Sequence, residues 1–195
     1  MKYLLVLFTT ILFALSINSI FAQDESKGMN EEMMKKMQEY MTPGPMHELL
    51  AKGVGEWKTE ITSWMDPNMP PTVTEGKSVC EAILGGRYFQ TKETATFMNM
   101  PFEGRSIFGY DNATKKFFGT WIDNMGTGIM ITEGVYNEAT KTFAYTGSGV
   151  GPTGEYKVRE ISKYIDDDHS FFEMYMAEGG KPEMKMMEIK YTRIK

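Results

Sequence analysis

The chain has 195 residues with a formal net charge of −5, and 42% of its residues are hydrophobic. This length supports one well-buried core but not two full-sized domains. The acidic balance argues against binding to nucleic acid or to anionic membranes, because both need a surplus of Lys and Arg. The single cysteine, Cys80, excludes an intrachain disulfide and a multi-cysteine zinc site.

Residues 1–22 have the pattern of a secretory signal peptide. Lys2 gives a positive start, residues 3–15 are almost continuously apolar, and Ala22 lies at the predicted cleavage position. The apolar run is shorter than the roughly 20 residues that a membrane-spanning helix needs. We therefore expect a periplasmic or secreted protein, with no membrane attachment after cleavage.

Residues 23–42 form a methionine-rich segment ahead of the main domain. Met29, Met33 and Met37 recur every four residues, which predicts a helix of about three turns with its thioethers on one side. Such a helix offers soft ligands for Cu(I). The favoured interpretation is an adaptable apolar stripe that docks on a neighbouring surface.

Residues 43–195 are predicted to form one β-barrel domain. A short helix over residues 46–53 is followed by alternating runs that are separated by turn clusters. Residues 110–117 and 136–143 align without a gap and predict two hairpins of the same design, with Asp111 and Asn137 opening the turns. The predicted strands are 57–65, 73–83, 87–97, 102–110, 117–123, 128–136, 142–148, 155–165, 171–176 and 184–194.

The connections between these runs are too short for crossover helices, so the sheet must be antiparallel and up-and-down. Closing ten such strands into a barrel removes both exposed edges. A barrel of more than about eight strands leaves space that its own side chains do not fill. The expected fold is therefore an all-β, ten-stranded barrel with short N-terminal helices and a hollow centre.

Two motifs at opposite ends of this domain resemble a known signature. Gly55-Glu56-Trp57 opens the first strand, and Arg193 lies on the last. This arrangement resembles the calycin signature of lipocalins, fatty-acid-binding proteins and nitrobindins. The resemblance implies that Trp57 lies at the barrel base and that Arg193 packs across its indole. The further glycines of the nitrobindin haem pattern are missing, and His169 falls in a predicted loop, so we expect no cofactor.

A longer series of motifs resembles an uncharacterised bacterial family, known as domain of unknown function fifteen-seventy-nine. The motifs include PGPMHELL at 43–50, LGGRY at 84–88, GTWID at 119–123 and FEMY at 172–175. The resemblance covers about 43–195. It implies a calycin-like barrel and no established activity.

The barrel interior is the first candidate site, since a mostly apolar pocket with a few polar groups is typical of small-molecule binding. The predicted ligand-binding residues are aromatic and polar groups on three strands: Trp121, Asp123, Arg159, Glu173 and Tyr175. The alternative is structural, with Asp123 starting a turn and Arg159 paired to Glu173. Strand alternation alone does not decide which face is inside. The expected partner is a small apolar molecule of unidentified structure.

An enzyme remains an alternative, with Asp123, Glu173 or His47 as acid or base. It requires at least two of these groups within hydrogen-bond reach of each other. No catalytic residue is assigned, because nucleophile, phosphate-loop and zinc-protease motifs are all missing from the sequence. A metal site is not expected either, since His47 and His169 lack a third local ligand. The sequence leaves the ligand and the oligomeric state open.

Overall fold

The computed structural model describes residues 29–66 and 68–194. The chain divides into two compact units, one ending at Thr42 and one formed by Pro43–Lys195. In the first unit, residues 29–41 form a helix whose methionine side chains are exposed. Nothing tests the Cu(I) hypothesis for this helix, which stays a prediction. The predicted signal peptide lies outside the described residues.

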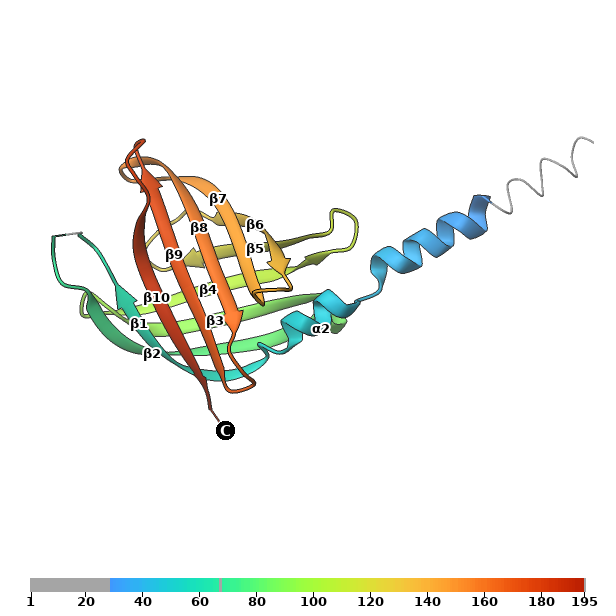
Figure 1. Cartoon of the computed structure of the whole chain (residues 1–195), viewed down its shortest axis with the longest axis horizontal. Coiled ribbons are helices and arrows are strands. Elements are labelled where there is room, and N and C mark those ends of the chain that lie inside the picture. The colour runs from blue at the N-terminus through green and yellow to red at the C-terminus, as the bar shows by residue number, and fades with distance from the viewer. Residues whose placement is uncertain (1–28, 67, 195) are drawn as a thin grey trace, which may run out of the picture. The chain divides into compact units, whose positions relative to one another are not determined.

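The second unit is a closed barrel of ten antiparallel strands, so the expected fold is confirmed (Figure 1). Helix α2 (Pro45–Ala51) precedes the barrel, and each predicted run overlaps one observed strand. The strands are β1 (Gly55–Ser63), β2 (Thr72–Ile83), β3 (Tyr88–Phe97), β4 (Met100–Asp111), β5 (Lys116–Asp123), β6 (Met130–Asn137), β7 (Thr142–Gly151), β8 (Gly154–Tyr164), β9 (His169–Glu178) and β10 (Met184–Arg193). No helix among the described residues combines the length and apolar character needed to span a bilayer.

Short turns with side-chain acceptors keep sequence neighbours paired. A side-chain oxygen of Asp111 accepts a hydrogen bond from the Ala113 amide at 2.8 Å, and Asn137 accepts one from Ala139 at 3.0 Å. These contacts fix the two similar hairpins β4–β5 and β6–β7. The circle then closes where β1 pairs with β10, and Trp57 lies opposite Arg193.

An aromatic plug fills the barrel end next to α2. Leu50 of α2 packs in one buried cluster with Cys80, Phe89, Phe117 and Phe143. Burial in this cluster raises the pKa of the Cys80 thiol to about 12, which favours the neutral thiol of a packed side chain. This end of the barrel is therefore sealed.

The strand register shows which residues of each strand face inward, starting from the buried Trp57. Trp57 pairs with Ser78, Ser78 with Glu93, and Glu93 with Gly104. Side chains point to opposite faces at successive strand positions, so this chain of pairs assigns inside and outside for every strand.

Candidate functional site: the barrel interior

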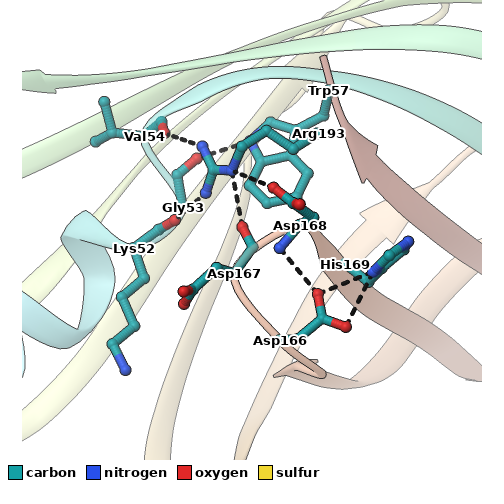
Figure 2. A network of polar contacts seen from close by, with 9 residues as sticks. All are labelled: Lys52, Gly53, Val54, Trp57, Asp166, Asp167, Asp168, His169 and Arg193. Atoms are coloured by element: carbon teal, nitrogen blue, oxygen red, sulfur yellow. Dashed lines mark hydrogen bonds and ion pairs between the residues drawn. The ribbon is translucent and has the colours of Figure 1, made fainter. Parts of the chain in front are cut away.

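Arg193 and Trp57 organise the barrel base (Figure 2). The Arg193 guanidinium carbon lies 4.1 Å from the centre of the Trp57 ring. Its nitrogens donate to the carbonyl oxygens of Lys52 and Val54, each at 2.7 Å, and of Asp167 at 2.8 Å. One side chain thus ties the segment before β1 to the β8–β9 turn, which gives it a structural role.

Sterics explain why the Gly-Glu-Trp motif begins with a glycine. Gly55 has a φ of +134°, and a Cβ there would lie 2.6 Å from an Arg193 guanidinium nitrogen. A larger residue would be strained and would displace the arginine. Trp57 completes the arrangement by donating its indole N–H to the Gly53 carbonyl at 2.9 Å.

Two of the predicted ligand-binding residues, Trp121 and Asp123, lie on the inner face of β5, away from the plug. Trp121 donates its indole N–H to Asp123 at 2.8 Å, and its ring stacks with that of Phe102 at 6.4 Å. The ring also lies against Gly104, where a Cβ would overlap it. Asp123 accepts the amide of Met125 as well, so it both starts a turn and orients the tryptophan.

The other three predicted residues, Arg159, Glu173 and Tyr175, lie on the outer face of β8 and β9. Each occupies the opposite alternation from the inward residues of its strand. Arg159 lies 4.0 Å from the centre of the Tyr175 ring and forms an ion pair with Glu183 at 2.5 Å. The alternative pairing of Arg159 with Glu173 is wrong.

Glu173 instead pairs with Lys185 at 2.5 Å on the outer face. Since Asp123 points inward, the barrel wall separates these two carboxylates. The third acid–base candidate, His47, is buried in α2, where its Nδ1 accepts the Gly44 amide at 3.1 Å. The three groups proposed for acid–base catalysis are therefore not brought together.

His169 is the first residue of β9 rather than a loop residue, and its ring nitrogen lies 2.8 Å from Asp166 (Figure 2). This pair is exposed and lies at the turn that Arg193 holds. Across residues 29–66 and 68–194, no three His, Cys, Asp or Glu side chains gather as metal ligands.

The structure reveals two inward carboxyl groups that the sequence analysis missed, Glu93 on β3 and Glu160 on β8. Desolvation raises the pKa of each to about 7, although the Ser78 hydroxyl donates to Glu93 and the Thr132 hydroxyl to Glu160. Neither forms an ion pair with any described residue. We call Glu93, Glu160 and Tyr191 the lumenal acidic group.

Glu93 and Glu160 lie on opposite walls. Four strands separate β3 from β8 in either direction around the barrel. Burial, with smaller contributions from the charges of Glu93 and Glu160, raises the pKa of Tyr191 on β10 well above its ordinary value. The three residues therefore share one enclosed space.

Among the residues that the structure describes, no lysine lies on the inner face to balance this charge. In the described strands, the register places every lysine, Arg105 and Arg159 on the outer face. The outward lysines are Lys58, Lys77, Lys92, Lys116, Lys157, Lys163, Lys185 and Lys190. Arg193 is the inward exception, and its guanidinium is occupied by carbonyl oxygens at the base.

Several inward side chains around the lumenal acidic group keep accessible surface. Glu93, Glu160 and Tyr191 are surrounded closely enough to be desolvated, yet each keeps accessible surface. The inward apolar residues further from the plug are also only half-buried, among them Trp121, Phe172, Met174 and Met176. These inward side chains are enclosed but not fully buried, as expected where a ten-stranded barrel is not filled by its own side chains.

A hollow of about 490 Å³ lies on the outside of β2–β5. Its floor includes the exposed Ile107, Ile122 and Ile129, and charged Glu81 and Arg105 border it.

Comparison with known proteins agrees with this architecture. The family model described as "Protein of unknown function (DUF1579)" matches residues 42–193. The chain belongs to the DUF1579 family. No curated protein matches it.

Two solved structures share the barrel of this DUF1579 protein. Rv2717c from M. tuberculosis has 14% identity and a TM-score of 0.59, with 79% of this chain and 100% of that chain covered. The S-type phycobiliprotein lyase CPES from Guillardia theta has 12% identity and a TM-score of 0.54, with coverages of 82% and 97%. At these identities the likeness shows the fold alone.

Proposed function

We propose that this protein binds a small, largely apolar molecule non-covalently inside its barrel. The observation that carries the proposal is the half-buried apolar lining above a sealed end. Trp121, Phe172, Met174 and Met176 keep accessible surface in the lumen, while Leu50 and Phe117 close the plug. Burying such surface against an apolar ligand contributes about 25 cal/mol per Å².

The proposal is tested by obstructing the lumen. Ser106 is half-buried on the inner face of β4, in register with Thr91 and Trp121. Ser106→Phe should weaken binding of Nile red, a neutral apolar dye, by about tenfold or more because the new ring occupies ligand space. Fluorescence titration of the purified barrel measures this effect.

A matched control places the same ring on the other face. Ser148 of β7 is exposed and pairs with the outward Lys157, so Ser148→Phe should leave dye affinity within about twofold of the parent. Equal losses in both variants, or no dye binding by the parent, would refute a lumenal site. Native mass spectrometry of protein from its own source should detect the retained molecule.

Residues 1–22 support a second part of the proposal, export before the barrel reaches its ligand. The full-length chain, expressed in a bacterium with a periplasm, should yield soluble periplasmic protein that begins at Gln23. Intact-mass measurement of the periplasmic fraction checks this. Recovery of protein that retains residues 1–22 only in the cytoplasm would contradict it.

A further inference from the structure

We infer that the molecule bound in the lumen is an organic cation, with its positive group held between Glu93 and Glu160. This inference rests on the proposed lumenal site and adds the charge of the ligand. Three independent features support it: the position of the carboxyl groups, the lack of an inward counter-charge, and the aromatic lining.

The first feature is position. The two carboxyl groups lie on opposite walls of one hollow, with Tyr191 between them in the circle of strands. Ser78 and Thr132 each supply one hydroxyl donor to these carboxylates, and a single donor does not use all the acceptor positions of a carboxylate. A group placed in this part of the lumen meets negative charge from both sides.

The second feature is charge balance. Burying a carboxylate is costly unless it is paired, and buried charges in proteins are normally paired or bound to metal. In the described part of the barrel, the inward residues near Glu93 and Glu160 supply hydroxyls and phenols but no lysine. Protonation relieves this cost at low pH, and above pH 7 a cationic ligand supplies the missing partner.

A bare metal ion does not fit this arrangement. Hard cations need several oxygen ligands converging at about 2.0–2.6 Å, whereas these carboxyl groups face each other across a barrel. The described residues also contain no cluster of three candidate ligands. An organic ammonium group on an apolar body is the cation that suits a wide lumen.

The third feature is the lining. Tyr145 and Tyr191 bring aromatic rings to the inner wall, with Trp121 and Phe172 further along it. Aromatic faces attract organic cations, and the attraction strengthens when water is excluded. The same walls therefore accept both the charge and the apolar body.

Decyltrimethylammonium and decanol separate charge from hydrophobicity, because their chains match and the quaternary ammonium group does not titrate. At pH 8 the cation should displace Nile red from the barrel at a concentration about tenfold lower than decanol. Below pH 6 this preference should shrink, because Glu93 and Glu160 then become protonated. Burial raises the pKa of the inward Cys80, Tyr145, Tyr164 and Tyr191, so these groups stay neutral throughout this range. Asp123, Glu178 and Arg193 also occupy inward positions, where they bond to Trp121, to Thr153 and to the base carbonyl groups respectively.

The variants Glu93→Gln and Glu160→Gln should each weaken cation binding by about tenfold and leave decanol binding unchanged. Decanol binding thus shows that each variant is folded. Glu133→Gln is the control, since Glu133 pairs with Lys116 on the outer face. If the cation and decanol bind the parent equally, or the double variant keeps the preference, the charge inference falls and the lumenal site stands. If neither compound displaces the dye, the charge inference and the proposed function both fall.

Discussion

Replacing Arg193 by leucine should lower the free energy of unfolding by roughly 3 kcal/mol, the larger of the two stability effects expected here. The variant loses donors to three carbonyl oxygens and the contact with the Trp57 ring. Hydrogen bonds from a charged donor contribute about 1.5–3 kcal/mol each, and water reaching the vacated carbonyl groups recovers part of the loss. Chemical denaturation of the barrel measures the difference.

Arg105→Leu is the matched control. Arg105 lies on the outer face of β4, and its pair with Glu103 is solvent-exposed at 3.0 Å. Exposed pairs contribute about 0–1 kcal/mol. A loss in Arg193→Leu no greater than in Arg105→Leu would mean that the base network does not hold the barrel closed.

The order of strands was predictable because turn chemistry and alternation act locally. Asp111 and Asn137 each begin a turn through their own side chain, and such turns mark where one strand ends and the next begins. Closure of the barrel followed from the cost of leaving two sheet edges unpaired. These are properties of short segments, so the sequence contains them directly.

The inner face of β8 and β9 was not predictable in the same way. Ile161 and Phe171 lie on the outer face, together with Arg159 and Glu173. Because these two residues are apolar, the sequence wrongly suggested that this face is the inner one. The register that corrects this runs through every strand pair from Trp57. A ladder of ten pairings is a property of the closed barrel and not of one segment.

The sequence nevertheless contained a pattern that indicates an inward position for Glu93. Phe89, Ala95 and Phe97 alternate with it along β3, so Glu93 is the one charged residue in an otherwise apolar and hydroxyl-bearing stripe. Glu160 stands in the same way among Tyr156, Val158 and Tyr164 on β8. A lone carboxylate within a core-facing stripe identifies a buried charge more reliably than polar residues beside an apolar one.

The ligand-free barrel should become more stable at pH 8 when either lumenal carboxylate is neutralised. The pKa of Glu93 and of Glu160 rises from 4.5 to about 7 on folding. The folded state therefore binds more protons than the unfolded state between these values, and stability falls as pH rises through this window. Each shift corresponds to roughly 3 kcal/mol above pH 7, and contact with lumenal water reduces the expected gain in Glu93→Gln or Glu160→Gln to about 2 kcal/mol.

This gain should vanish at pH 4.5, where the parent carboxyl groups are already protonated in the folded barrel. Glu103→Gln should behave oppositely, because Lys92 and Arg105 lower the pKa of Glu103, and its loss removes a favourable surface interaction. Urea unfolding at both pH values checks these signs. An unchanged or lowered stability of both lumenal variants at pH 8 would show that the carboxylates are not desolvated.

Together with the binding experiment, this result decides why the barrel keeps two unpaired carboxylates. If these carboxylates had a structural role, neutralising one of them would lower the stability of the barrel, as breaking a buried ion pair does. If they bind a ligand, neutralising one of them should instead raise the stability of the empty barrel and lower its affinity for the cation. Addition of decyltrimethylammonium at pH 8 should then stabilise the parent more than Glu93→Gln, since stabilisation by a ligand increases with its affinity for the folded state. Such a reversal, with the variant more stable alone and less stabilised by the ligand, is the trade-off expected of a site built for binding.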